Sequence, residues 1–245
     1  QMEASVDYRR WAFESAALDL ALRQTDRSLA DVVGRPYRPV RFVASTRADI
    51  APYRELDPAL EFKLDVDDSW DATVMGRLAE TDRVRVLDFK AYYHGTRVDL
   101  APNAELYRAV ARTFPNAVLE DAWLEGECGE ALADARERLS FDAPIHSWKD
   151  VGKLPVSPKW LNIKPSRFGT LRKLLDCIDE CEAGGISMYG GGQFELGPGR
   201  LQIQKLASVF YAEAPNDVAP SAYNEGPPQP GLPRSPLPAP EGPGF

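Results

Sequence analysis

Four short apolar segments of the sequence each end on a charged residue that can take part in chemistry. They close on Asp88, Glu120, Asp142 and Lys164, at intervals of 32 residues (88 to 120), 22 (120 to 142) and 22 (142 to 164). Each interval fits one strand with its crossover helix, and the carboxyl ends of such strands converge on one face of an α/β barrel. The spacing therefore predicts that the four side chains lie on consecutive strands around one rim.

Three carboxylates on one rim repel one another, which raises their pKa values. A divalent cation removes this penalty, and oxygen ligands suit Mg²⁺ or Mn²⁺. We therefore expect Asp88, Glu120 and Asp142 to hold a metal ion. Each carboxylate taken alone is more simply explained as the first polar residue of a loop, but four successive strands that end in this way favour a shared site.

Lysines complete the group. Lys63 ends an earlier strand, and Lys164 ends a strand expected on the opposite side of the barrel. A buried lysine beside other cations loses its proton more readily, so both are candidate acid/base residues. Lys90 lies two residues after Asp88, where it would contact a substrate or pair with a carboxylate.

The strands that must position these residues alternate with amphipathic helices. Apolar runs fall at residues 40–44, 60–64, 84–88, 117–120, 139–142, 160–164 and 186–189, and helical periodicity falls at 8–33, 72–80, 104–113, 129–138, 171–182 and 201–210. This alternation is typical of parallel strands with crossover helices. Seven strands approach the eight of a closed barrel. An open doubly wound sheet is the alternative, although no glycine-rich turn follows the first strand.

Composition divides the chain into three parts. We expect the opening helix of a barrel domain in residues 1–36, the barrel in 37–212, and an extended arm that packs on the barrel in 213–245. Ten prolines lie between Pro215 and Phe245. Proline fixes φ and removes a backbone donor, so this stretch cannot continue helices or central strands.

The charge and the cysteines restrict the class of protein. The 245 residues carry a net charge of −8, and an acidic surface repels phosphate backbones, so we expect no nucleic-acid partner. No apolar run has the length of a membrane span, and no export signal is evident. Cys128, Cys177 and Cys181 form a sparse, odd set, which indicates free thiols and a cytoplasmic location.

Three segments of the sequence resemble a known family. Residues 13–23 (FESAALDLALR) with 28–34 (SLADVVG), 161–169 (LNIKPSRFG) and 190–197 (GGGQFELG) are similar to the opening helix, the sixth-strand lysine motif and the seventh-strand segment of the enolase superfamily. Within that superfamily, the resemblance is to the muconate-lactonising and o-succinylbenzoate-synthase-like group. It implies an α/β fold, a TIM-type (β/α)7β-like barrel, with the family's N-terminal capping domain absent or missing from this chain.

The resemblance also implies roles for individual residues. Asp88, Glu120 and Asp142 correspond to Mg²⁺ ligands on the third, fourth and fifth strands, and Lys164 to an acid/base residue. The residues that usually follow the third-strand and fifth-strand aspartates are replaced in this sequence. This departure raises the chance of an altered reaction.

The second strand departs from the family pattern as well. It reads Lys63-Leu-Asp65 in place of Lys-x-Lys, so either Lys63 supplies the second base or that base is lost. In an alternative register, residues 63–70 are the third-strand motif and Asp65 is the first metal ligand. We prefer Asp88, because the other register leaves too many residues before Lys164.

Further residues are expected at the same rim as substrate contacts. They are Lys90, His146, Gly190, Gly191, Gly192 and Glu195. The glycines offer backbone N–H groups to a substrate carboxylate, with a simple turn as the alternative. His146 fits an acid/base or substrate contact as well as it fits a hydrogen-bonded loop residue.

These features predict an Mg²⁺-dependent enolase-superfamily enzyme that abstracts the α-proton of a small carboxylate substrate to give a metal-stabilised enediolate. The outcome would be dehydration, as in o-succinylbenzoate synthase, or racemisation or epimerisation, so the enzyme would be a lyase or an isomerase. One alternative is a catalytically inactive barrel that acts as a binding or scaffold protein, and a Schiff-base aldolase that uses Lys164 is another. No membrane partner is expected, and a homo-oligomer is compatible with the sequence.

Overall fold

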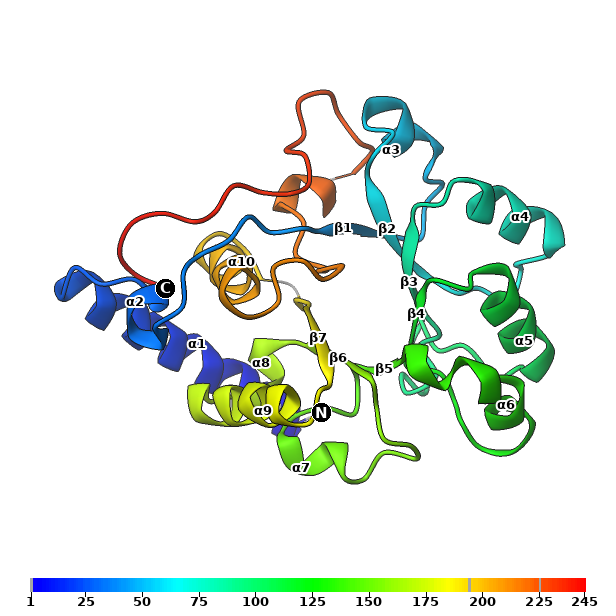
Figure 1. The fold of residues 1–245 in the computed structure, drawn as a ribbon, viewed down its shortest axis with the longest axis horizontal. Helices are drawn as coiled ribbons and strands as arrows, with labels where there is room; N and C mark the ends of the chain where they lie inside the picture. The colour runs from blue at the N-terminus through cyan, green and yellow to red at the C-terminus, as the bar shows by residue number, and fades with distance from the viewer. Residues whose placement is uncertain (1, 194, 225) are drawn as a thin grey trace.

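A computed structural model of the chain describes residues 2–193, 195–224 and 226–245. Its centre is a parallel sheet of seven strands that pair in chain order and curl around a common axis (Figure 1). The strands are β1 (Val43–Thr46), β2 (Glu61–Asp65), β3 (Val84–Asp88), β4 (Val118–Glu120), β5 (Leu139–Phe141), β6 (Trp160–Ile163) and β7 (Ser187–Gly190). The predicted α/β barrel class is confirmed, and each predicted strand overlaps an observed one.

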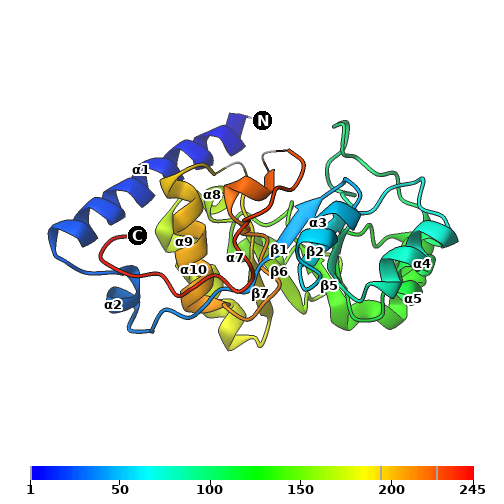
Figure 2. The ribbon, with the colours of Figure 1, turned by 90° about the horizontal axis from the view of Figure 1, so that it is seen from above.

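Helices cover the outside of the curled sheet (Figures 1 and 2). They are α1 (Met2–Gln24), α2 (Leu29–Val33), α3 (Ala51–Leu56), α4 (Ala72–Glu80), α5 (Ala104–Thr113), α6 (Gly126–Ala131), η1 (Ala133–Arg138), α7 (Trp148–Val151), α8 (Pro165–Phe168), α9 (Leu171–Ala183), α10 (Pro198–Phe210) and η2 (Ser221–Asn224). The single opening helix expected over 8–33 is in fact two helices. Asp26 between them has a φ of 51°, and Ser28 and Asp31 form a capping box that starts α2.

Two residues close the gap between β7 and β1. The N–H of Asp217 donates to the carbonyl of Gly190 in β7 at 2.8 Å, and the N–H of Val43 in β1 donates to the carbonyl of Asn216 at 2.8 Å. Asn216 and Asp217 therefore act as a very short eighth strand that lies inside the segment expected to form the arm.

The interior of the barrel is mostly polar. Val86, Val118 and Tyr189 form a small apolar cluster there, whereas the large apolar core lies between the sheet and the surrounding helices. Lys63 on β2 is buried, with 1% of its surface exposed. Because a buried charge is costly without a partner, this interior must supply opposite charges of its own.

The C-terminal arm runs along the outside of the barrel to α1 (Figure 2). Leu237 and Val40 exchange backbone hydrogen bonds of 2.8 and 2.9 Å, which place the arm beside the entry to β1. The ring of Phe245 meets Trp11 of α1 edge-on, with centroids 6.0 Å apart. These contacts join the two ends of the chain.

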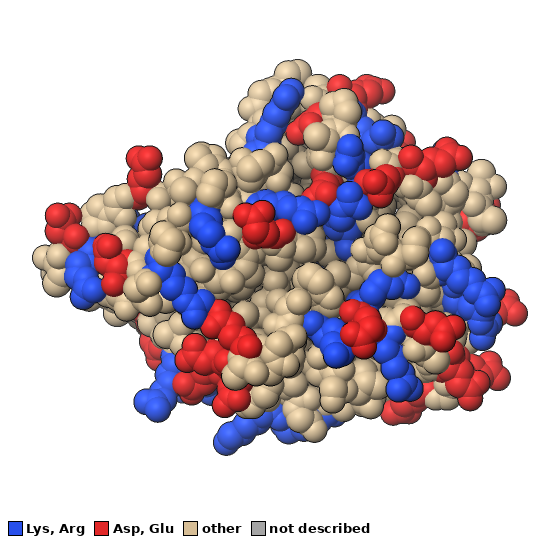
Figure 3. Space-filling view, in the orientation of Figure 1, with Lys and Arg blue, Asp and Glu red and all other residues tan. Residues whose placement is uncertain are grey.

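The face in Figure 3 carries basic and acidic side chains interspersed rather than in blocks of one sign. Within the described residues, no helix has both the length and the apolar character that a bilayer crossing requires. The cysteines Cys128, Cys177 and Cys181 are buried free thiols.

Three charged side chains, those of Arg41, Glu61 and Arg85, form hydrogen bonds across the amino ends of the first three strands. Glu61 accepts hydrogen bonds of 2.6 and 2.9 Å from Arg41 and of 2.6 Å from Arg85. Burial would raise the pKa of Glu61, but the two guanidinium groups hold it below its usual 4.5. A carboxyl with a lowered folded-state pKa stabilises the fold above its unfolded pKa and loses that effect as the pH falls through the folded value.

Glu61→Gln removes the charge that both arginines bind. We expect urea denaturation at pH 7 to show a loss of about 1–2 kcal/mol in the free energy of unfolding, because bidentate and partly buried pairs exceed ordinary surface pairs. The difference between variant and parent should begin to shrink as the pH falls below the usual pKa of 4.5 and should vanish below the lowered folded-state pKa, where the parent carboxyl is protonated as well. A difference that is independent of pH would contradict this assignment.

Asn216→Ala tests the closure of the barrel. The buried Asn216 side chain accepts from the N–H of Gly190 at 2.7 Å. Its nitrogen lies within 3.4 Å of four carbonyl oxygens, those of Arg41, Tyr211, Ala212 and Ala214. Truncation leaves several of these groups unpaired, so we expect a loss of about 3 kcal/mol in the free energy of unfolding. The exposed Asn103→Ala, which removes a helix cap, should cost about 1 kcal/mol, and equal losses would argue against a closing role.

Candidate active site

Acidic residues gather at the carboxyl ends of β3 and β4. Asp88, Glu120 and Asp121 are fully buried, and each offers an oxygen that lies within 4.8 Å of the others. Asp88 pairs with Glu120 in the register of the two strands. The two predicted carboxylates Asp88 and Glu120 are therefore brought together, and Asp121 joins them.

Three side chains donate hydrogen bonds to the carboxylate of Glu120. Lys63 and Tyr189 donate short hydrogen bonds to its two oxygens, and the amide nitrogen of Asn162 donates at 3.2 Å. Tyr189 also contacts the hydroxyl of Ser140 at 2.9 Å. Tyr189 is thus part of the polar network.

Lys63 connects this network to the neighbouring acids. Its ammonium group lies 3.2 Å from Asp88 and 3.8 Å from Asp217, in addition to its contact with Glu120. Burial would lower the pKa of Lys63, but these carboxylates raise it well above its usual value. Lys63 therefore sits as a fixed internal cation beneath the rim.

Lys90 forms a second cationic group on the β3 side. Its ammonium group pairs with Asp88 and lies 3.4 Å from Asp65, which in turn is paired with Arg47. Lys90 has a φ of 54°, a left-handed conformation that is unfavourable for a side chain of this size. The hydrogen bond from its own N–H to Asp88, at 3.0 Å, helps to hold this conformation.

Asp142 occupies the β5 side of the rim with a different set of partners. Arg167 donates to one of its oxygens at 2.7 Å, Lys164 lies 2.9 Å from the other, and Tyr93 donates at 3.0 Å. Burial would raise the pKa of Asp142, but Arg167 and Lys164 lower it. Arg167 also donates to Tyr93 at 3.0 Å, so these four side chains form one network.

Asp121 supports the start of the loop after β5. It accepts the N–H of Asp142 at 2.8 Å on one oxygen and the N–H of Ala143 at 2.9 Å on the other. Burial, followed by repulsion from Asp142 and Asp88, raises the pKa of Asp121 to about 7. Its two oxygens thus fix the backbone at Asp142.

Glu120 and Asp88 differ in how their surroundings shift the pKa of the carboxyl group. Burial raises the pKa of Glu120 well above the usual value, and Asp88 and Asp142 add to this, against the attraction of Lys63. For Asp88 the balance is the reverse, because Lys63 and Lys90 overcome burial and lower its pKa. Nearby cations therefore offset burial and repulsion at Asp88 but not at Glu120.

The predicted substrate contacts occupy different environments. His146 is partly exposed, and its ring nitrogen lies 3.3 Å from the carbonyl of Arg167. Glu195 accepts from the hydroxyl of Ser166 at 3.1 Å and from the N–H of Gln193 at 2.6 Å. Lys90 lies within the carboxylate network already described. Phe194 of the seventh-strand segment, which is not one of these predicted contacts, lies outside the described residues.

The glycines of the seventh-strand segment have structural reasons for their small size. The N–H groups of Gly190 and Gly191 donate to Asn216 and to the carbonyl of Ile163. A Cβ on Gly191 would lie 2.3 Å from the side-chain oxygen of Asn162. A Cβ on Gly192 would lie 2.5 Å from Glu195. At Gly190 and Gly191, backbone donation to a substrate would therefore require breaking an existing hydrogen bond.

The donor set fits a hard divalent cation. The buried groups at the rim are carboxylates, and the side-chain oxygen of Asn162 is buried without a hydrogen-bond partner among the described residues. Oxygen donors of this kind suit Mg²⁺ or Mn²⁺. Extra positive charge would also offset the repulsion that raises the pKa of Glu120.

Solved structures with the same fold place the chain in a known architecture. A member of the enolase superfamily from Enterococcus faecalis V583, described as unknown, has a TM-score of 0.65 and 18% identity over 84% of this chain and 58% of its own length. The dipeptide epimerase from Methylococcus capsulatus, complexed with Mg and the dipeptide L-Arg-D-Lys, has a TM-score of 0.66 and 18% identity. The match covers 84% of this chain and 62% of the epimerase. A muconate lactonizing enzyme has a TM-score of 0.62 and 18% identity, and the match covers 84% of this chain and 61% of that enzyme.

The fold is thus that of the enolase-superfamily barrel, and the predicted resemblance is confirmed at the level of the fold. The chain belongs to the family described as domain of unknown function (DUF8230), whose C-terminal-domain profile matches residues 36–225 and whose N-terminal-domain profile matches residues 1–32. The o-succinylbenzoate synthase of Bacillus subtilis (strain 168) is 38% identical over 66 residues, which are 27% of this chain and 18% of that protein. The chain therefore spans about three fifths of the solved structures named above and less than a fifth of this relative.

The pair of Lys63 and Glu120 can be tested by a double-mutant cycle. Lys63→Met leaves a buried carboxylate without its cation, so we expect the free energy of unfolding to fall by about 3 kcal/mol. Glu120→Gln in the Lys63→Met background should recover part of this loss, because it removes the uncompensated charge. Urea denaturation of the four proteins measures the coupling, with the exposed Lys153→Met as the control. Strictly additive losses would show that the two side chains are not coupled.

Proposed function

We propose that this barrel belongs to an Mg²⁺-dependent enzyme that removes the α-proton of a small carboxylate substrate. The observation that carries the proposal is the group of buried carboxylates at the strand ends, which faces Lys164 across the same rim. The enolase-superfamily fold supports the proposal, and one structural neighbour is complexed with Mg and a dipeptide, which suggests where to look for substrates.

In this proposal Asp88, Glu120 and Asp142 hold the cation. Asp121 is nearer to the first two, but both of its oxygens already accept backbone N–H groups of the β5 loop. Asp121 would therefore position Asp142 rather than replace it. When bound, the cation would stabilise the negative charge that develops on the substrate as its proton leaves.

Lys164 is the proposed acid/base residue. It follows β6, 8% of its side chain is exposed, and Asp142 holds its ammonium group at the rim. Lys63, the second base expected from the sequence, is paired with Glu120 and Asp88 below the rim. We therefore assign Lys63 to charge compensation. One accessible base favours elimination of water over racemisation or epimerisation, which needs proton return on either face.

Other residues at the rim would orient the substrate. Arg167, with its guanidinium group fixed by Asp142 and Tyr93, offers a planar cation to a carboxylate. When the amide of Gln193 is turned so that its oxygen faces Arg167, it accepts hydrogen bonds of 2.6 and 2.9 Å. Lys90, His146 and Glu195 remain proposed substrate contacts.

A specific observation favours a second candidate function. Lys63, Lys90 and Lys164 already supply positive charge to Asp88, Glu120 and Asp142. A barrel compensated by its own lysines can keep its fold without a metal ion and act as a binding or scaffold protein. Cation binding distinguishes the two functions.

Metal binding is the first test. We expect Mn²⁺, followed by electron paramagnetic resonance, to bind the parent protein and to bind Asp142→Asn more weakly by at least about tenfold. Asp121→Asn should weaken binding less than Asp142→Asn. The reverse order would identify Asp121 as the third ligand, and absence of binding to the parent would favour the scaffold function.

Proton exchange is the second test. With Mg²⁺ in D₂O, NMR of a panel of dipeptides and hydroxy acids should show exchange of the α-proton for deuterium by the parent protein. Lys164→Ala should slow this exchange by about 10²–10⁴-fold, the usual contribution of a positioned acid/base. Lys159→Ala, a nearby lysine whose side chain is 51% exposed, is the matched control and should leave the rate unchanged. Equal exchange by Lys164→Ala and the parent would refute the assigned role.

A further inference from the structure

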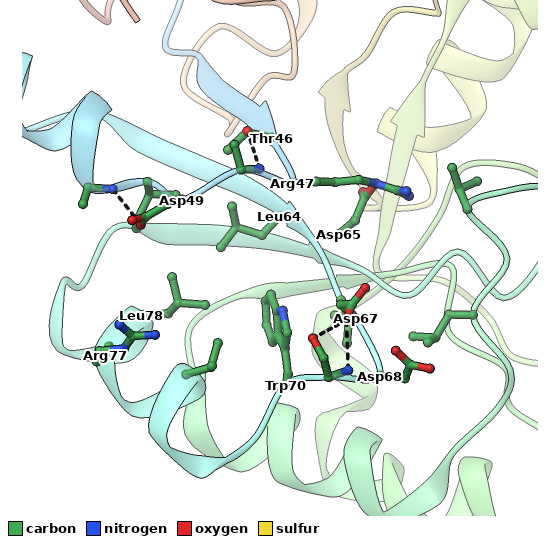
Figure 4. A pocket seen from close by; sticks show the side chains of 18 of the residues that line it. Thr46, Arg47, Asp49, Leu64, Asp65, Asp67, Asp68, Trp70, Arg77 and Leu78 are labelled. Atoms are coloured by element: carbon green, nitrogen blue, oxygen red, sulfur yellow. Dashed lines mark hydrogen bonds and ion pairs between the residues drawn. The ribbon is translucent and has the colours of Figure 1, made fainter. Parts of the chain in front are cut away.

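A second cavity lies outside the barrel, on the outer side of β2. It has a volume of about 980 Å³ and is bounded by the loop after β1, by α3 and α4, and by the loop after β3 (Figure 4). Leu64 lines it, whereas its neighbour Lys63 points into the barrel toward Glu120. Because successive side chains of a strand face opposite sides, Leu64 places the floor of this cavity outside the barrel, whereas Asp65, on the face of Lys63, brings its edge to the barrel mouth.

The floor of this cavity is apolar. Leu64 and Val66 are buried with 4% of their surface exposed, and Leu78 and Trp70 of the α4 region line the cavity beside them (Figure 4). A volume of this size with an apolar floor is typical of sites that take small organic molecules.

The acidic groups of the cavity wall are largely engaged by the chain itself. Asp65 is paired with Arg47 and Lys90. Three further aspartates accept backbone N–H groups: Asp49 from Ala51, Asp67 from Ser69 and Asp99 from Gly95. Asp68, the remaining aspartate of the wall, is exposed to solvent.

Arg47 of the same wall is paired with Asp65, but the other three arginines of the wall are not engaged in this way. Arg54, Arg77 and Arg97 line the cavity, and within the described ranges none of the three forms an ion pair. The Nε atom of Arg54 is buried and has no hydrogen-bond partner in the described part of the chain. An unpaired buried donor is costly, so this atom marks a place where an acceptor is missing.

From these features we infer that the cavity is a binding site for an organic carboxylate with an apolar or aromatic body. The apolar floor takes the body of the ligand, and the guanidinium groups of Arg54, Arg77 and Arg97 bind its carboxylate. Four of the five aspartates of the wall already have partners within the chain, and none of them is paired with Arg54, Arg77 or Arg97 in the described ranges. This inference does not depend on the proposed reaction.

The cavity also borders the candidate active site. Asp65 forms part of its wall and, through Lys90, contacts Asp88 at the rim. A ligand that attracted Arg47 away from Asp65 would change the charge next to Lys90.

The test uses 4-fluorophenylacetate as the probe and ¹⁹F NMR titration of the full chain. We expect saturable binding, and we expect the neutral 4-fluorophenylacetamide to bind at least about tenfold more weakly, because charge-assisted hydrogen bonds to the carboxylate are lost. The double variant Arg77→Gln/Arg97→Gln should weaken binding of the acid by about tenfold as well. Both side chains are exposed, so the fold should not depend on them.

Matched variants locate the site. Arg112→Gln, an exposed arginine of α5 that does not line the cavity, should leave the affinity unchanged, and Lys164→Ala should do the same. Arg54→Gln should also reduce the affinity for the acid, and its melting temperature is measured to confirm that the variant folds. Equal binding of acid and amide, an unchanged affinity in the double variant, or a loss of binding in Lys164→Ala would each overturn the inference. So would the absence of saturable binding.

Discussion

The structure depends on the charge balance inside the barrel mouth. Four carboxylates are buried there, on Asp88, Glu120, Asp121 and Asp142. Four cations face them from the same rim or just below it: Lys63, Lys90, Lys164 and Arg167. Burying any of these charges alone would cost several kcal/mol, so the strand ends can come together only because acids and bases are interleaved. Any cation that bound at this rim would therefore have to compete with these existing pairs.

The closure of the barrel serves this balance. Asn216 brings Asp217 next to β7, and Asp217 then approaches Lys63 from the open side of the sheet. A barrel left open at β7 would expose Lys63 and Glu120 to water and weaken every pair in the network, because Coulomb interactions fall as the local dielectric constant rises. Two residues of a segment with no periodic pattern thus control the environment of residues far away in the sequence.

The sequence predicted the strands and the rim well, because both depend on local signals. Apolar runs that end in a charge identified Asp88, Glu120, Asp142 and Lys164, and all four lie at strand ends. Asp121, Asn162 and Tyr189 were missed as network members, because their importance comes from neighbours on other strands. The adjacent acids Glu120 and Asp121 were the available signal for Asp121. The closing role of Asn216 had no local signal, since proline-rich surroundings indicate an arm rather than a strand.

The departures from the family pattern on β2 and after β3 involve two residues that contact each other. Asp65 stands where the pattern has a lysine, and Lys90 follows β3 with its ammonium group 3.4 Å from Asp65. The cation at this part of the rim therefore follows β3 rather than ending β2, and Asp65 pairs with Arg47 at the edge of the outer cavity. Lys90 adopts a left-handed backbone conformation at this position, and such a conformation costs folding free energy. The pair of Asp65 and Lys90 connects the outer cavity to the barrel mouth, since Lys90 also contacts Asp88.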